Sequence, residues 1–139
     1  ERADLAGYKL VICGNGPLKG KVEEAARRNK SIVYKGRVPD SERSTIMAES
    51  LALIFPSIRE GFGLTAIEAA ACGTPTIAFN VPGLRDTVKQ NGTLVEDVGG
   101  MARAMKRYVK SRPSPTTCQA WARTFDWKKS EKKWMEAVV

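Results

Sequence analysis

Histidine is absent from this chain of 139 residues. Because histidine is the commonest general base in enzymes and the commonest metal ligand, its absence excludes the most frequent acid–base and metal-site designs. Any proton transfer must use carboxylates, lysines, tyrosines or another polypeptide. Long apolar runs are missing too, so no segment resembles a membrane span. The chain begins with Glu1 rather than Met, and we expect it to be a fragment or a processed piece.

Cysteine is scarce, with only Cys13, Cys72 and Cys118 in the chain. An odd number of widely spaced cysteines fits neither a disulfide framework nor a metal-ligand pattern, so we expect no metal site. Cys13 and Cys72 lie among apolar or small residues. We therefore predict reduced, buried thiols and a cytoplasmic protein.

Acidic residues are scarce only toward the C-terminus. Residues 1–100 carry 13 basic and 12 acidic side chains, whereas residues 101–139 carry 10 basic and 3 acidic ones. Such an excess of basic side chains is typical of a solvated surface, which we favour, or of a surface that binds anionic lipid or nucleic acid. No recognition motif for nucleic acid is present and the excess lies away from the glycine-rich loops, so we expect no nucleic-acid partner.

Apolar runs of strand length alternate with segments of helical periodicity, which predicts an α/β fold. We expect a single domain over residues 1–139: a Rossmann-like parallel sheet with helices on both faces and a C-terminal helical segment over 113–139. Residues 111–115 are expected to form a turn. The predicted strands are 8–13, 31–34, 51–55, 75–79 and 93–96, and the predicted helices are 18–29, 40–50, 65–72, 84–89, 101–110 and 127 to the end.

Glycine-containing loops follow four of these strands. Parallel sheets bind ligands where the carboxyl ends of their strands meet, so the four loops should gather along one edge. They are residues 14–17, 36–39, 56–63 and 80–83.

The most informative loop is the one that joins Pro56 to the helix after Gly63. Two carboxylates, Glu60 and Glu68, flank it and can accept hydrogen bonds from hydroxyl pairs. The glycines let a backbone approach closely, and the helix start offers free N–H groups to an anion. This plan suits a ligand with hydroxyls at both ends and negative charge between them, such as a sugar joined through a diphosphate to a nucleoside. The amides expected to face the anion are those of Phe62, Gly63, Leu64 and Thr65.

These segments together resemble the C-terminal, donor-binding half of a retaining GT-B glycosyltransferase of the glycosyltransferase 4 (group 1) type. The family signature is Glu, seven residues, Glu, which is specific in this context, and the likeness extends over nearly the whole chain. The matching segments are 10–17 (LVICGNGP), 36–38 (GRV), 54–57 (IFPS), 60–68 (EGFGLTAIE), 68–75 (EAAACGTP), 82–86 (PGLRD), 91–95 (NGTLV) and 125–127 (FDW).

The resemblance implies roles for the matching residues. Glu60 would be the catalytic residue, contacting the hydroxyls of the transferred sugar and stabilising charge at its anomeric centre, while Glu68 would bind the ribose. The backbone from Gly61 to Thr65 would hold sugar hydroxyls and diphosphate. The remaining donor-binding residues would be Arg37 and Val38, whose backbone would meet the nucleobase, and Gly14 and Gly16, which would leave room for the nucleotide.

The resemblance also implies what lies outside residues 1–139. The family's donor-binding domain opens with a further strand, in the middle of the sheet, and its acceptor-binding domain is N-terminal. We therefore expect unpaired strand edges, marginal stability and no transfer activity for these residues alone. The complete protein would move a hexose from a UDP-, GDP- or ADP-sugar to a glycan, lipid or small molecule, without metal or cofactor. A non-catalytic nucleotide-sugar-binding or sensing module is the alternative.

The last helix has its own alternatives. Trp127, Trp134 and Val138 recur at helical spacing, with lysines over much of the remaining surface. Such a helix can lie on the inner face of a membrane as a peripheral contact. We favour packing of the tryptophans on this domain or on the missing one, which the family resemblance also implies. The sequence leaves the oligomeric state open.

Overall fold

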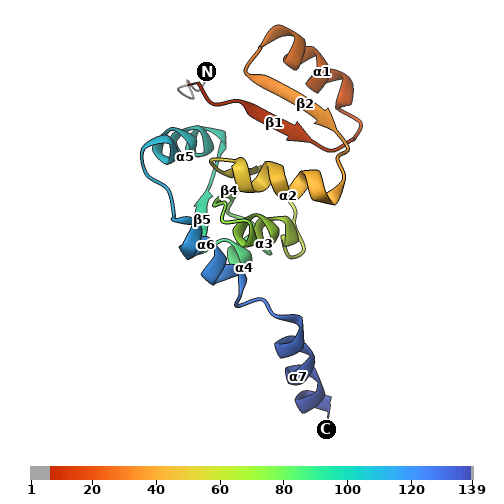
Figure 1. Cartoon of the computed structure of the whole chain (residues 1–139), viewed down its shortest axis with the longest axis vertical. Coiled ribbons are helices and arrows are strands. Elements are labelled where there is room, and N and C mark those ends of the chain that lie inside the picture. Colours follow the sequence, from red (N-terminus) through yellow and green to blue (C-terminus); the bar gives the residue numbers. More distant parts are fainter. Residues whose placement is uncertain (1–6, 139) are drawn as a thin grey trace.

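The computed structural model describes residues 7–138, and residues 1–6 and 139 of the expected domain lie outside that range. Strands and helices alternate along most of the chain (Figure 1). The strands are β1 (Leu10–Cys13), β2 (Ile32–Gly36), β3 (Leu53–Phe55), β4 (Thr76–Phe79) and β5 (Gly92–Val95). The helices are α1 (Lys19–Arg28), α2 (Asp40–Glu49), α3 (Leu64–Ala71), α4 (Leu84–Thr87), α5 (Val98–Lys110), α6 (Pro115–Ala122) and α7 (Trp127–Val138).

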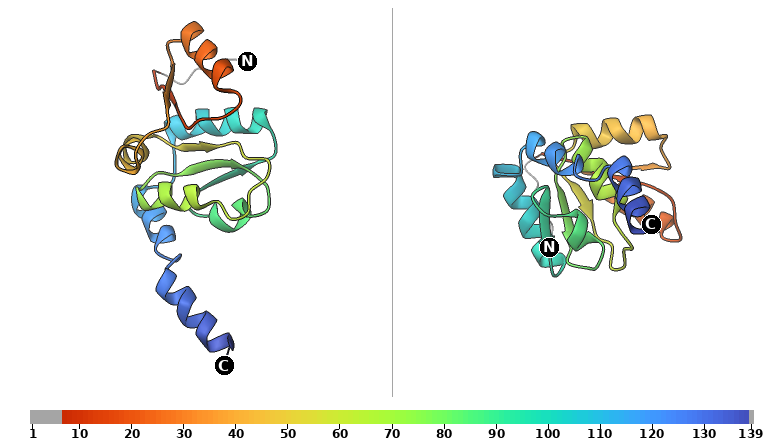
Figure 2. Two further views of the ribbon diagram at one scale, coloured as in Figure 1. Left: turned by 90° about the vertical axis from the view of Figure 1, so that its right-hand side faces the viewer. Right: turned by 90° about the horizontal axis from the view of Figure 1, so that it is seen from below.

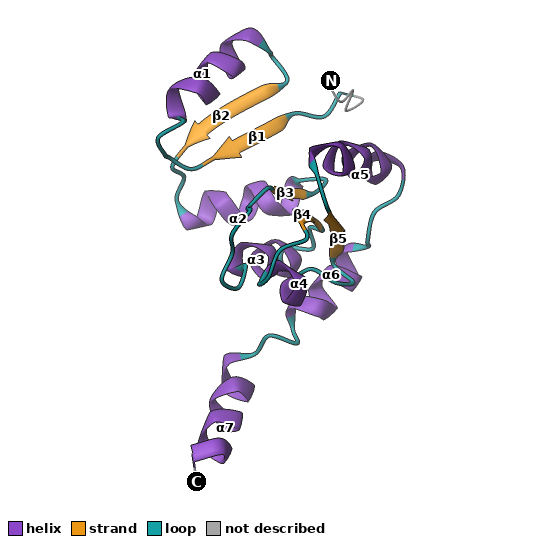
Figure 3. Cartoon of the chain, turned by 180° about the vertical axis from the view of Figure 1, so that it is seen from behind, coloured by secondary structure: helices purple, strands orange, loops and turns teal. Residues whose placement is uncertain are grey.

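The strands form two separate parallel sheets (Figure 3). One sheet pairs β1 with β2, and the other has the order β3-β4-β5. Each strand pair in the described range is parallel and is joined through a helix, as the alternating pattern predicts. Within residues 7–138, only β4 has strand neighbours on both sides, so the unpaired strand edges expected from the sequence are present.

The hydrophobic core lies on both faces of the three-stranded sheet. Successive residues of a strand point to opposite faces, and Ile77 and Ala78 of β4, both fully buried, belong to different clusters. Ile77 packs with Met101 and Tyr108 of α5, whereas Ala78 packs with the residues of α3 and α4. Figure 2 shows α5 on one face and α3 and α4 on the other. This layering confirms the predicted fold class.

The helix α6 was not predicted as a separate element, because the prolines after residue 111 suggested only a break. Ser114 and Pro115 in fact start this helix. Ser114 Oγ accepts a hydrogen bond from the Thr117 amide at 3.1 Å, and Pro115 occupies the first turn, where its missing N–H costs nothing. Cys118 and Ala122 then pack against Ala70 of α3.

Two further expectations are wrong. Cys13 is exposed and Cys72 is half-buried, so of the three thiols only Cys118 is buried. Trp127 and Trp134 are 82% and 71% exposed and do not pack on this domain, because α7 extends away from it (Figure 1). Packing on a missing domain stays a prediction. Among residues 7–138, no helix has the length and apolarity needed to cross a bilayer.

Candidate functional site

The loop after β3 leads into α3 through a glycine whose conformation other residues rarely adopt. Gly63 has φ of +92° and caps α3 without any side-chain hydrogen bond. The Gly63 carbonyl accepts from the Ala66 amide at 2.9 Å, so the helix begins at once. The N–H groups of the first turn, including those of Leu64 and Thr65, are left without helical partners, as at every helix start. They form a positive end suited to an anion.

Close packing fixes the shape of this loop. A Cβ added to Gly83 would lie 2.5 Å from the Glu60 carbonyl oxygen, and one on Gly63 would lie 2.7 Å from Leu84 Cδ2. Both distances are shorter than side chains tolerate, so the loops after β3 and β4 fit together only because glycines stand at both positions. The structure therefore confirms that these two loops meet at the carboxyl end of the sheet.

Glu60 lies within this packed loop but keeps its carboxylate available. The residue is half-buried, and no salt bridge within residues 7–138 involves it. Phe62 and Leu64, which follow in sequence, are 45% and 55% exposed, and Glu60 Cγ lies 3.7 Å from a Cβ added to Gly63. The Glu60 side chain therefore lies beside the residue that caps α3, where it can contact a polar ligand.

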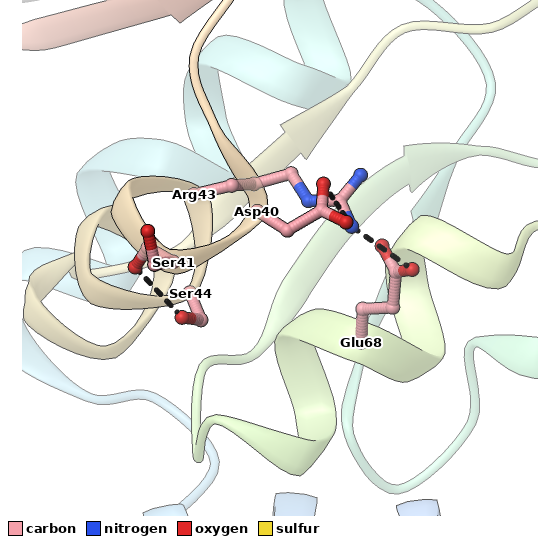
Figure 4. Close-up of polar contacts among 5 residues, drawn as sticks. All are labelled: Asp40, Ser41, Arg43, Ser44 and Glu68. Carbon is pink, nitrogen blue, oxygen red and sulfur yellow. Dashed lines mark hydrogen bonds and ion pairs between the residues drawn. The ribbon is translucent and has the colours of Figure 1, made fainter.

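Glu68 follows on α3 and has a partner that the sequence did not suggest. Glu68 Oε1 lies 3.5 Å from Nη2 of Arg43 on α2, and the same nitrogen lies 3.4 Å from Oδ1 of Asp40 (Figure 4). The guanidinium thus stands between two carboxylates that come from different helices. Arginine and glutamate at such sequence separation give no pairing signal, since only the fold brings them together.

The other two loops, after β1 and β2, are joined to each other. The Gly14 amide donates to the Gly36 carbonyl at 2.7 Å, and the Tyr34 hydroxyl donates to the Gly14 carbonyl at 2.9 Å. Space is open around both Gly14 and Gly16, where an added Cβ would meet no atom within 4 Å. In the loop before α2, Arg37 is exposed and Val38 is half-buried. These positions leave room for a ligand beside the loops.

A further ion pair joins β2 to α2. Lys35 Nζ is 2.6 Å from Glu42 Oε1, and this hydrogen bond raises the pKa of Lys35. The lysine is therefore already engaged by a carboxylate. Within residues 7–138, no group of three cysteine, aspartate or glutamate side chains is arranged to hold a metal ion.

An aromatic cluster beside the glycine loop was also not anticipated. The ring of Phe62 meets that of Phe125 edge-on at 6.0 Å, and Phe125 meets Trp121 at 5.3 Å. Trp121 Nε1 donates to the Thr87 carbonyl at 2.9 Å, which ties α6 to α4. The cluster supports the glycine loop from the C-terminal side. Its sequence signal was weak because the three aromatics lie on different elements.

Curated proteins similar to this chain are sugar-transferring enzymes. The chain is 33% identical over 119 residues to the 2-deoxystreptamine glucosyltransferase of Streptomyces kanamyceticus, which covers 81% of this chain and 30% of that enzyme. It is 31% identical over 136 residues to the glycogen synthase of Mycobacterium tuberculosis, covering 87% of this chain and 32% of that enzyme. The chain therefore spans about a third of the length of these relatives.

Solved structures and a family model agree with these relatives. The pneumococcal O-GlcNAc transferase GtfA, solved in complex with UDP and GlcNAc, matches 94% of this chain with 29% of its own length, at 26% identity and a TM-score of 0.78. AviGT4, a glycosyltransferase of avilamycin A biosynthesis, has the same fold at a TM-score of 0.75 and 19% identity, with 96% of this chain and 43% of AviGT4 covered. The family model described as "Glycosyl transferases group 1" matches residues 1–111. The chain belongs to the group 1 glycosyltransferases.

Proposed function

We propose that residues 1–139 bind the nucleotide-sugar donor of a retaining, metal-independent hexosyltransferase. The observation that carries the proposal is the packed loop from Glu60 to the start of α3, which presents a helix N-terminus between two carboxylates. A diphosphate would lie at the helix start, the sugar on the Glu60 side and the ribose on the Glu68 side. The relative GtfA, solved with UDP and GlcNAc, supports this class of ligand.

The proposed chemistry is electrostatic. Breaking the bond to the sugar leaves negative charge on the diphosphate and positive charge at the anomeric carbon. The amides at the start of α3 stabilise the first charge without reorganisation, and the Glu60 carboxylate stabilises the second. In the proposed complete protein, a domain outside these residues would bind the acceptor.

Two carboxylates near each other also occur in glycosidases, where one acts as acid and the other as nucleophile or base. The helix N-terminus between Glu60 and Glu68 argues against that reading, because it is built for an anion rather than for a glycosidic oxygen. A non-catalytic sensing module remains the second candidate. Its distinguishing property is donor binding without turnover in the complete protein.

The ribose role of Glu68 is tested with Glu68→Ala in the complete protein. A hydrogen bond to a charged group contributes about 1.5–3 kcal/mol, so nucleoside diphosphate affinity should fall about tenfold or more. Calorimetry with UDP, GDP and ADP, and with their sugars, measures this loss and identifies the base at the same time. Glu49→Ala is the matched control, since Glu49 is exposed at the far end of α2. Unchanged affinity in Glu68→Ala would refute the assignment.

The catalytic role of Glu60 is tested with Glu60→Gln, which keeps the shape of the side chain and removes its charge. Loss of a group that stabilises a transition-state charge typically lowers kcat by about 100- to 1000-fold. Nucleoside diphosphate affinity should change little, because Glu60 lies on the sugar side. A variant with full kcat and weakened donor binding would exclude Glu60 from the catalytic role.

A further inference from the structure

Arg43 is the one side chain of α2 that reaches the carboxylate proposed to bind ribose. Its Nη2 lies 3.5 Å from Glu68 Oε1 and 3.4 Å from Asp40 Oδ1 (Figure 4). The Asp40 side chain is 92% exposed, whereas those of Arg43 and Glu68 are each 42% exposed. Asp40 therefore shares its charge with solvent, and the pair with Glu68 is the better shielded of the two.

This pair links two different parts of the candidate site. Arg43 belongs to the first turns of α2, which begins directly after the loop containing Arg37 and Val38. Glu68 belongs to α3, which begins after the glycine loop. The contact thus joins the helix that follows the expected nucleobase loop to the helix that follows the expected diphosphate loop.

The geometry leaves part of the Glu68 carboxylate free. The contact with Arg43 uses Oε1, and a carboxylate has about four acceptor positions on its two oxygens. A half-exposed pair at 3.5 Å contributes little to the free energy of unfolding. Its effect is instead on the orientation of the Glu68 carboxylate. An unpaired glutamate on a helix surface would sample several rotamers, whereas a glutamate paired with a guanidinium from a neighbouring helix samples fewer.

We propose that Arg43 is a positioning residue that orients the Glu68 carboxylate toward the ribose hydroxyls of the donor. This inference rests on the proposed function and adds a residue that the glutamate signature does not contain. The guanidinium lies between Asp40 and Glu68, and its better shielded contact is the one with Glu68. The guanidinium acts through Glu68 and does not itself touch the nucleotide.

The test is a double-mutant cycle in the complete protein, read by calorimetry with the nucleoside diphosphate that binds best and with its 2′,3′-dideoxy counterpart. Arg43→Leu should weaken ribonucleotide binding about threefold to tenfold. It should leave dideoxynucleotide binding unchanged, and it should add no further loss in the Glu68→Ala background. Arg43→Lys should recover part of the affinity, because an ammonium keeps the charge but not the planar shape.

Arg28→Leu is the matched control, since Arg28 is an exposed arginine in an ion pair with Glu24 on α1. Equal losses with the ribose and dideoxy ligands, or an undiminished loss in Glu68→Ala, would show that Arg43 meets the diphosphate directly and would overturn the proposal. Tighter binding in Arg43→Leu would overturn it as well, because Arg43 would then be a competitor for Glu68. Absence of nucleoside diphosphate binding by the folded wild-type protein would instead refute the proposed function itself.

Discussion

Two parts of this molecule repeat the same strand–helix–strand pattern and end up very differently packed. In the first part, residues 10–36, β1 and β2 flank α1 and no residue is buried. In the second part, residues 53–95, β4 lies between β3 and β5 and its first three residues are buried. The comparison shows that a local pattern suffices to form strands and helices, whereas burial needs neighbours on both sides of a strand and both faces of a sheet.

The first part has a single strand pair, β1 with β2, within the described residues. Residues of β1 alternate between half-buried and exposed, and Val11 is 37% exposed although its side chain is apolar. We propose that a strand from outside residues 1–139 lies between β1 and β3 in the complete protein, and that it joins the two sheets into one. The first part would then resemble the second in burial, and residues 1–139 alone would be marginally stable.

The largest expected difference between the parts concerns their glycines. In Gly83→Ala, the added Cβ would lie 2.5 Å from the Glu60 carbonyl oxygen at a φ of +82°, so backbone strain and overpacking combine. We expect a loss of about 3–6 kcal/mol in unfolding free energy, with loss of donor binding, from urea denaturation and calorimetry.

Gly16→Ala is the matched control from the first part. No atom lies within 4 Å of its added Cβ and its φ is not positive, so stability should change by less than about 0.5 kcal/mol. Donor affinity should still fall if Gly16 makes room for the nucleotide. A Gly16→Ala variant as unstable as Gly83→Ala would contradict the view that the first part is loosely packed.

The glycine loop was predictable because its signals are local. The strand ending before Pro56, the glycines at 61 and 63 and the helix after them all follow from residue types in sequence order. The separation of the carboxylates by one loop and one helical turn follows as well. Which residues surround them did not follow, because Arg43 approaches Glu68 only after α2 has packed beside α3.

The strands and helices were predictable because their signals are also local. Burial was predicted less well, because it depends on residues that are distant in sequence. Alternating periodicity gave five parallel strands, and the strand bounds differ from the expected ones by a few residues. Burial of Cys13 was wrong because it was inferred from apolar neighbours in sequence, whereas burial depends on which strand lies alongside. Residues 113–139 were predicted to be helical, but α6 was not predicted as a separate helix because Pro113 and Pro115 were taken as helix breakers without Ser114, whose side chain caps α6.

A second, smaller difference is expected for core side chains. Ile77 of β4 is fully buried between α5 and its strand neighbours, so Ile77→Ala should cost about 2–4 kcal/mol of unfolding free energy. Val11 of β1 is 37% exposed, so Val11→Ala should cost less than about 1 kcal/mol in residues 1–139 alone. Urea denaturation measures both.

The same two variants in the complete protein test the missing strand. If a strand covers β1 there, Val11→Ala should become clearly more costly than in residues 1–139, while the cost of Ile77→Ala should stay the same. An equal loss of unfolding free energy for Val11→Ala in both forms would mean that no strand covers β1. It would refute the proposal that a further strand joins the two sheets.

The smallest expected effect is a difference in the alkylation of two thiols, Cys13 of β1 and Cys118 of α6. Burial raises the pKa of both Cys13 and Cys118, with Lys35 lowering that of Cys13 and Arg112 that of Cys118. Both are therefore neutral thiols at pH 7, and their alkylation rates should rise about tenfold per pH unit until the pH passes the raised pKa. Exposed Cys13 should react directly, whereas buried Cys118 should react only through opening of the α3–α6 contact.

Peptide mass spectrometry after timed alkylation measures this contrast in residues 1–139 and in the complete protein. Cys13 lies on the same face of β1 as Val11, so a strand or helix that covers this face should slow its alkylation in the complete protein. Cys118 should be equally protected in both forms, since its contacts with α3 lie within the described residues. Slow alkylation of Cys13 in residues 1–139 themselves would show that the first part is already covered, and the difference between the two parts would disappear.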